Sequence, residues 1–225
     1  MSGKTIQIVH DSESFNCYFS TRGENRSGII VLHAWWGLND FFRNFCDRLA
    51  GEGFTIMAPD LYGGHIASTV GQAEVLCSKL DRNEAFGKIN ATLDYFLREG
   101  QLRGGKLGVV GFSMGGYFAL DLTLMRREVK AVVIFYATSP TRQWNRSGAS
   151  YLGHFAEKDP YESAADVVDL EKSLISAGKN AKFYTYPGTG HWFFENDRQD
   201  AYNSTASDLA WKRSLEFLRT TLSEN

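Results

Sequence analysis

The chain has 225 residues, of which 43% are hydrophobic and 22% charged, and its formal net charge is -2. This length and composition predict a single globular α/β domain over residues 1–225. A charge so close to zero argues against nucleic acid or an anionic membrane as the main partner.

The sequence predicts a cytoplasmic protein. The first residues, Met1 to Thr5, do not begin the apolar core of a signal peptide, and no segment has the roughly eighteen apolar residues of a membrane span. Cys17, Cys46 and Cys77 have no metal-binding spacing and are expected to be free thiols in a reducing compartment. We expect Cys46 and Cys77 to be buried because they fall in helical patterns, and the reactivity of all three thiols stays open.

The predicted elements alternate as in a mostly parallel, doubly wound sheet with helices on both faces. Alternating polar and apolar residues predict an antiparallel hairpin at 5–10 and 14–20. Apolar runs and their flanking residues predict strands at 28–33, 54–58, 106–110, 131–136, 150–155 and 181–186. Helical patterns are found at 40–50, with Asn39 or Asp40 as the N-cap, and at 72–80, 84–97, 117–125 and 203–222.

The segment Gly111-Phe112-Ser113-Met114-Gly115 lies between a predicted strand and a predicted helix. Strand, sharp turn and helix form the context of a G-x-S-x-G nucleophile elbow, in which the serine has a strained backbone and the glycines allow close chain passage. A serine between glycines can also be an ordinary turn residue. The downstream acid and histidine favour the catalytic interpretation, with Ser113 as the nucleophile.

A serine nucleophile needs a base and an acid that orients the base. His191 follows the last predicted strand in a Gly-flanked loop, and Asp159 follows the strand before it, so the chain order is Ser, Asp, His. Loops at the carboxyl ends of parallel strands are where such partners meet. The alternatives are His10, His33, His65 and His154 for the base and Glu157, Asp166 and Asp169 for the acid.

The oxyanion hole of this arrangement combines the N–H after the nucleophile with an N–H from the loop after the third strand. These positions predict Met114 and, within residues 33–37, Trp35. His33 is expected to hold that loop in place. An apolar substrate pocket is predicted from aromatic residues in or beside these loops, namely Trp36, Tyr136, Trp144 and Trp192.

With these residues in place, the chain resembles the dienelactone hydrolase family of the α/β-hydrolase superfamily. The resemblance runs from about Gly28 to the last helix, and it depends on five segments around the residues named above. These are residues 31–39, residues 58–63, residues 111–116, Asp159, and residues 190–194. It implies an α/β-hydrolase fold without a large cap, small ester or lactone substrates, and no metal or organic cofactor.

The chain also departs from the family pattern. Members that cleave dienelactone have a cysteine nucleophile, a glutamate in the oxyanion loop and a carboxylate-binding arginine four positions after the histidine; this chain has Ser113, Ala34 and Glu195 there. We therefore expect a substrate other than dienelactone. Arg142, Arg146 and Arg198 are candidates for binding another acid, with solvated surface positions as the alternative.

The sequence thus predicts a cofactor-independent serine hydrolase of small esters, lactones or thioesters, as a monomer or small homo-oligomer. The alternative of another class is a ligand-binding or regulatory protein that keeps the hydrolase fold and has little turnover. Within the enzymes, a thioesterase or acyltransferase stays open.

Overall fold

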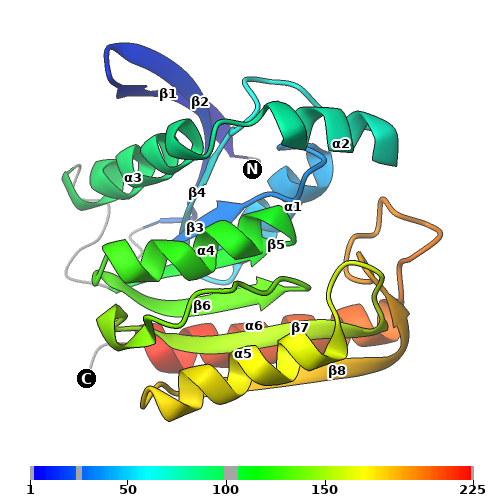
Figure 1. The fold of residues 1–225 in the computed structure, drawn as a ribbon. Helices are drawn as coiled ribbons and strands as arrows, with labels where there is room; N and C mark the ends of the chain where they lie inside the picture. Colours follow the sequence, from blue (N-terminus) through cyan, green and yellow to red (C-terminus); the bar gives the residue numbers. More distant parts are fainter. Residues whose placement is uncertain (1–2, 24–26, 99–105, 224–225) are drawn as a thin grey trace. The chain divides into compact units, whose positions relative to one another are not determined.

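The computed structural model describes residues 3–23, 27–98 and 106–223 (Figure 1). The chain divides into two compact units, Met1–Leu107 and Gly108–Ser223. Each unit is a β-sheet covered by helices, in agreement with the predicted α/β class. That residues 1–225 form one domain stays a prediction.

The first unit has the strand order β1-β2-β4-β3. The predicted hairpin is confirmed, with Ile8 of β1 opposite Phe15 of β2, and β4 pairs antiparallel with β2 and parallel with β3. Every residue of β3 and β4 is buried, as their continuous apolar runs require. The elements are β1 (Lys4–His10), β2 (Glu13–Ser20), β3 (Gly28–Leu32), α1 (Asp40–Gly51), β4 (Thr55–Pro59), α2 (Val70–Lys79) and α3 (Arg82–Arg98).

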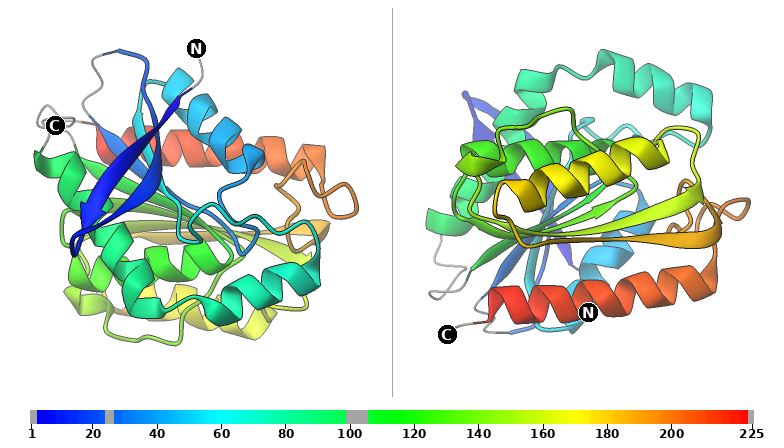
Figure 2. Two further views of the ribbon diagram at one scale, coloured as in Figure 1. Left: turned by 90° about the horizontal axis from the view of Figure 1, so that it is seen from above. Right: turned by 60° about the horizontal axis from the view of Figure 1, so that its bottom comes forward.

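Polar caps fix where the helices of the first unit begin. The side chain of Asn39 accepts a hydrogen bond from the Phe42 N–H, so Asn39 rather than Asp40 is the N-cap of α1. Thr69 caps α2 in the same way, which starts this helix at Val70, earlier than predicted. Helix α1 packs on β2 and β4 and α3 packs on β1, β3 and β4, on opposite faces of these strands (Figure 2).

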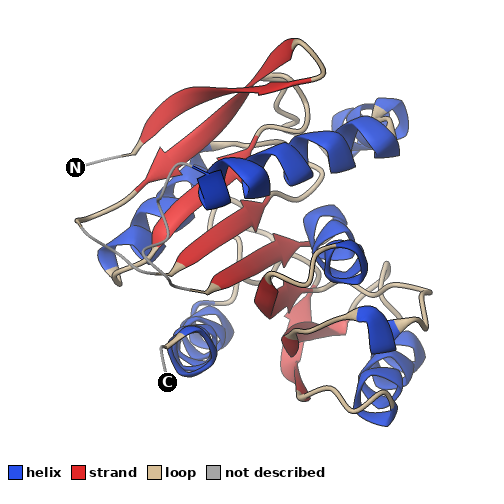
Figure 3. Ribbon diagram, turned by 90° about the vertical axis from the view of Figure 1, so that its left-hand side faces the viewer, coloured by secondary structure: helices blue, strands red, loops and turns tan. Residues whose placement is uncertain are grey.

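The second unit has the strand order β5-β6-β7-β8, with β7 parallel to both of its neighbours. Helices α4 and α5 cover one face of these strands and α6 covers the other (Figure 3). The elements are β5 (Leu107–Phe112), α4 (Met114–Met125), β6 (Val129–Phe135), the 3-10 helix η1 (Trp144–Arg146), β7 (Ser150–Lys158), α5 (Ala164–Ser176), β8 (Ala181–Gly190) and α6 (Ser204–Leu222).

Strand β8 is longer than predicted, because it continues past Tyr186 to Gly190 and includes Pro187. It is the last strand in the order and pairs only with β7, and a proline without an N–H is tolerated on such an edge strand. The pairing is interrupted by a register shift between Ala156 and Lys158 of β7. Beyond this shift, Lys158 pairs with Gly190, so the ends of both strands stay together.

No helix in the described part of the chain is long and apolar enough to cross a membrane. Within the same residues, no insertion between the elements is large enough to form a cap domain.

His154 on β7 is fully buried and both ring nitrogens have hydrogen-bond partners. Its Nδ1 lies 2.8 Å from the Tyr186 hydroxyl and its Nε2 lies 3.0 Å from the Ser214 hydroxyl. Burial, with a smaller effect from the nearby Arg213 charge, lowers the pKa of His154 to about 3. His154, an alternative base in the sequence analysis, is therefore a neutral core residue and does not contact the predicted nucleophile.

This burial predicts a pH dependence of stability. In the unfolded chain His154 is protonated below a pKa of about 6.5, whereas the folded protein resists protonation until about pH 3. The favourable contribution of His154 is thus complete above pH 6.5 and is lost as the pH falls toward 3. Urea unfolding should show that the stability difference between wild type and His154→Gln shrinks by roughly 2–3 kcal/mol between pH 6.5 and 4.5. A difference that stays constant over this range would contradict the assignment.

Candidate active site

Ser113 forms a sharp turn between β5 and α4, with φ of 48° and ψ of -115°. This left-handed backbone is costly for a residue with a side chain and is concentrated at functional sites. The Ser113 N–H donates to the carbonyl of Phe135 at the end of β6 (2.9 Å), and the Ser113 carbonyl accepts from the Gly116 N–H (2.8 Å). These bonds hold the turn in the elbow geometry that the sequence predicts.

Two glycines make room for the elbow. A Cβ at Gly111 would lie 2.4 Å from the carbonyl oxygen of Gly115, and a Cβ at Gly116 would lie 2.5 Å from the Cβ of Ala137. Both distances are far inside van der Waals contact, and the first involves backbone that has no freedom to move aside. The strand and the helix can therefore approach each other closely only because these positions lack side chains.

The imidazole of His191, directly after β8, contacts both predicted partners. Its Nε2 lies 3.0 Å from the Ser113 Oγ, and its Nδ1 lies 2.7 and 2.8 Å from the two carboxylate oxygens of Asp159. An ionised carboxylate only accepts, so Nδ1 carries the proton and Nε2 is left to accept from the serine hydroxyl. The His191 and Asp159 side chains are 3% and 2% exposed, so little water competes for these bonds.

Asp159 is held in place by the backbone that follows it. Its Oδ1 also accepts from the N–H groups of Tyr161 (2.9 Å) and Glu162 (3.1 Å). The structure places the alternative acids elsewhere: Glu157 accepts from the Gly188 N–H (2.9 Å), Asp169 binds Arg142, and Asp166 accepts from the Ser163 hydroxyl. Asp159 is the acid that touches His191.

His33, the predicted loop anchor, is fully buried in the first unit. Its Nδ1 lies 2.7 Å from the Ala34 carbonyl oxygen, and its Nε2 accepts from the Leu61 N–H (3.2 Å). Burial lowers the pKa of His33, so the ring is neutral and donates through Nδ1. It joins the loop after β3 to the loop after β4, which agrees with a structural role.

Three aromatic rings surround the imidazole of His191. The ring centroids of Tyr136, Tyr161 and Trp192 lie 4.7, 4.9 and 5.2 Å from that of His191. Tyr136 and Trp192 both have positive φ, 41° and 66°, although neither is glycine. With Ser113, they make up three of the five non-glycine residues that have positive φ in the described parts of the chain. Backbone strain is therefore concentrated at this site.

The predicted oxyanion donors fall in different units. Met114 is the first residue of α4, where helix N–H groups point outward and favour negative charge. Trp35 lies in the first unit, in the turn after β3, next to the buried Trp36, whose ring meets it edge-on at 5.5 Å. The roles of Trp35 and Trp36 stay predictions from the sequence.

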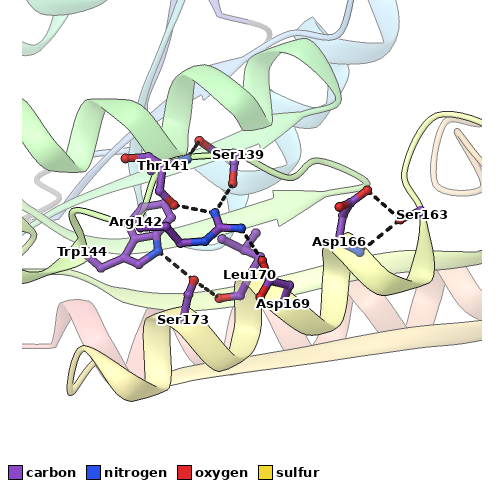
Figure 4. Close-up of polar contacts among 9 residues, drawn as sticks. All are labelled: Ser139, Thr141, Arg142, Trp144, Ser163, Asp166, Asp169, Leu170 and Ser173. Atoms are coloured by element: carbon purple, nitrogen blue, oxygen red, sulfur yellow. Dashed lines mark hydrogen bonds and ion pairs between the residues drawn. The ribbon is translucent and has the colours of Figure 1, made fainter.

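Figure 4 shows Trp144 and Arg142 beside α5. Trp144 is fully buried and donates its Nε1–H to the Ser173 hydroxyl (2.9 Å), which makes it a core residue. Its prediction as a lining of the substrate pocket finds no support in this geometry. Arg142 donates to Asp169 and to the carbonyls of Ser139 and Thr141, so its charge is already engaged.

The other two candidate arginines also have polar neighbours. Arg146 donates to the Gln143 side chain (3.3 Å), and Arg198 lies 3.4 Å from the Asp197 carboxylate. Each of these arginines is thus paired within its own segment of the chain.

The three cysteines are free thiols. Cys17 and Cys46 are buried, and burial raises the pKa of both thiols, so they are poor nucleophiles. Cys77 is only half-buried, contrary to the prediction, because α2 buries little besides Ala73. Among the described residues there is no group of three or more His, Cys, Asp or Glu side chains that could hold a metal ion.

The sequence analysis did not predict the burial of two acidic residues beside the site, Glu162 and Glu195. Glu162 accepts from the Thr138 hydroxyl (2.6 Å), and burial together with the Asp159 charge raises the pKa of Glu162 to about 7. Glu195 is fully buried and accepts from the Tyr136 hydroxyl (2.5 Å). Their positions in the sequence gave no sign of burial, because an acid in a loop is usually solvated.

Comparison with known proteins identifies the family. The model of the dienelactone hydrolase family matches residues 15–222. A protein of Aquifex aeolicus, provisionally named a carboxymethylenebutenolidase, is 28% identical over 98% of this chain and 99% of its own length. A Bradyrhizobium protein, provisionally named a 2-oxo-3-(5-oxofuran-2-ylidene)propanoate lactonase, is 27% identical over 85% of this chain and 82% of its own length.

A solved structure shows the same fold. The dienelactone hydrolase-like promiscuous phosphotriesterase from metagenomic libraries superposes with a TM-score of 0.88 at 19% identity, over 99% of both chains. The predicted α/β-hydrolase fold is thereby confirmed. By its sequence match over residues 15–222, the chain belongs to the dienelactone hydrolase family.

Proposed function

We propose that the protein is a serine hydrolase that cleaves small carboxylic esters or lactones through an acyl-enzyme on Ser113. The observation that carries the proposal is the imidazole of His191, which lies 3.0 Å from the serine hydroxyl and 2.7 Å from the Asp159 carboxylate. Nucleophile, base and orienting acid within hydrogen-bond distance are what acyl transfer by a serine requires.

In the first half of the reaction, the Ser113 Oγ attacks the carbonyl carbon of the substrate while His191 Nε2 takes the hydroxyl proton. Asp159 keeps the imidazole in the tautomer that leaves Nε2 free to accept, and it stabilises the imidazolium. The Met114 N–H at the start of α4 is our candidate for holding the negative oxygen of the tetrahedral intermediate. The sequence prediction for the second donor is the Trp35 N–H.

Collapse of the intermediate breaks the ester bond, and His191 gives its proton to the leaving alkoxide. An opened lactone keeps this alcohol on the acyl chain. In the second half, water attacks the acyl-enzyme, His191 takes a proton from the water, and Ser113 leaves with that proton restored. No metal or organic cofactor enters these steps.

The substrate class draws support from the relatives. The Bradyrhizobium relative is provisionally named a lactonase, and the family as a whole is named for the hydrolysis of a lactone. A thioester substrate, or an acceptor other than water, would use the same groups and stays open. Four positions after His191, the family resemblance leads us to expect an arginine that binds the dienelactone carboxylate, but this chain has the buried Glu195 there. We therefore propose a substrate other than dienelactone.

The main alternative is a ligand-binding protein on a hydrolase fold. Its motivation is that this chain has Ala34 and Glu195 where the sequence resemblance leads us to expect a glutamate and an arginine. The arrangement of Ser113, His191 and Asp159 favours the hydrolase, because a binder has no need for a buried, oriented base. A measurement of ester turnover distinguishes the hydrolase from the ligand-binding protein.

Replacement of the nucleophile tests the hydrolase directly. With p-nitrophenyl acetate, Ser113→Ala should lower kcat by roughly 10⁴–10⁶-fold without a matching loss of thermal stability, because only the attacking oxygen is removed. A fluorophosphonate should add one covalent mass to wild type, at Ser113, and none to the variant. Wild-type turnover that does not depend on Ser113 would favour the binding protein.

A matched pair of variants tests the choice of acid. Asp159→Asn should lower kcat by roughly 10⁴-fold, because an amide next to Nδ1 favours the wrong imidazole tautomer. Glu157→Gln, at the rival carboxylate bound to the Gly188 N–H, should leave kcat within a factor of three. Steady-state kinetics of both variants decide the matter, and equal losses would reject Asp159 as the orienting acid.

A further inference from the structure

Tyr136 has an unusual position directly after β6. Its φ is 41°, a left-handed backbone that a tyrosine rarely adopts, and its side chain is fully buried. The Tyr136 N–H donates to the carbonyl of His154 (2.7 Å), which anchors this backbone to β7. A strained backbone of this kind persists only where surrounding contacts stabilise it. The contacts of the Tyr136 side chain should therefore account for this conformation.

The Tyr136 side chain joins two groups from one turn. Its ring lies against the imidazole of His191, with centroids 4.7 Å apart and planes inclined by 53°. Its hydroxyl donates to the Glu195 Oε1 (2.5 Å), and the Glu195 N–H in turn donates to the Trp192 carbonyl (2.9 Å). The segment from His191 to Glu195 thus supplies both the imidazole and the carboxylate, and Tyr136 touches each.

The hydroxyl is a donor in this pair. Burial, and next the charge of Glu195, raise the pKa of Tyr136 well above its usual value, so the phenol keeps its proton. This bond of 2.5 Å ends on a fully buried carboxyl group, which fixes the position of the Tyr136 ring.

Tyr161, another ring beside His191, is less restrained than Tyr136. Tyr161, whose ring centroid is 4.9 Å from that of the imidazole, is 49% exposed and lies in the loop after β7. Tyr136 is fully buried and bonded at both its N–H and its hydroxyl. The Tyr136 ring is therefore a fixed surface against which the imidazole of His191 packs.

We propose that Tyr136 and Glu195 are positioning residues for His191: the bond from the Tyr136 hydroxyl to Glu195 holds the tyrosine ring in place, and the ring keeps the imidazole facing Ser113. The inference rests on the proposed hydrolase function. A small displacement of the base costs rate rather than substrate affinity, because the alignment of Nε2 with the serine hydroxyl matters in the reacting complex.

The simpler alternative is that the pair serves stability alone. Tyr136→Phe leaves the Glu195 carboxylate buried without this donor, so a loss of activity in that variant could follow from a weakened fold. The double variant Tyr136→Phe/Glu195→Leu removes both partners, and such a replacement recovers much of the stability that a single one loses. A positioning role and a purely structural role predict different kcat values for it.

Kinetics with p-nitrophenyl acetate and thermal unfolding are measured for wild type, Tyr136→Phe, Glu195→Leu, the double variant and Glu195→Gln. We expect both single variants to lose roughly tenfold in kcat with KM within twofold. The double variant should lose no more than either single one, because all three break the same bond, and it should do so at a recovered melting temperature. Glu195→Gln keeps an oxygen acceptor and should stay within threefold of wild type.

Tyr151→Phe is the matched control. Its hydroxyl is also buried and bonded, to Ser147 (2.6 Å) and Thr123 (2.8 Å), but it does not contact His191. It should lower the melting temperature as Tyr136→Phe does and leave kcat unchanged.

A double variant with wild-type kcat, or single losses that multiply in the double variant, would overturn the positioning role. The failure of the underlying function looks different, because wild type itself would then neither turn over the ester nor take up a fluorophosphonate on Ser113. If a single variant does not fold, the double variant and Glu195→Gln still decide the question.

Discussion

The imidazole of His191 is held by two hydrogen bonds at once, and the rest of the second unit is arranged to keep it there. Its partners come from separate strand ends: Ser113 follows β5, and Asp159 follows β7. His191 itself follows β8, whose pairing with β7 resumes at Lys158 and Gly190 after the register shift. The parallel pairing of β7 with β8 brings the acid and the base to the same edge of the sheet, and the strained elbow brings the serine to them.

Much of this could be predicted from the sequence, because the signals are local. The elbow needs glycines at fixed offsets from Ser113, and a helix and a strand on either side are recognisable from their apolar patterns. Chain order and loop position then selected Asp159 over Glu157, and the structure places only the former against His191. Caps such as Asn39 likewise depend on a few consecutive residues.

Other features could not be predicted, because they depend on contacts between distant segments. Tyr136 precedes β7 in the chain and Glu195 follows β8, so their bond joins distant segments. Neither the hydrophobic pattern nor the structural propensity of the sequence shows that this acid is buried. Trp144 lies near the predicted loops in the sequence, yet its indole points to Ser173 on α5. Strand β8 runs through Pro187 because an edge strand tolerates a missing N–H, which depends on its place in the sheet.

The most direct test of the central claim is a crystal structure of the protein after reaction with a fluorophosphonate. The account predicts phosphorus bonded to the Ser113 Oγ, with His191 Nδ1 still on Asp159 and a phosphonyl oxygen within hydrogen-bond distance of the Met114 N–H. An adduct on a different side chain, or an imidazole turned away from both partners, would contradict it.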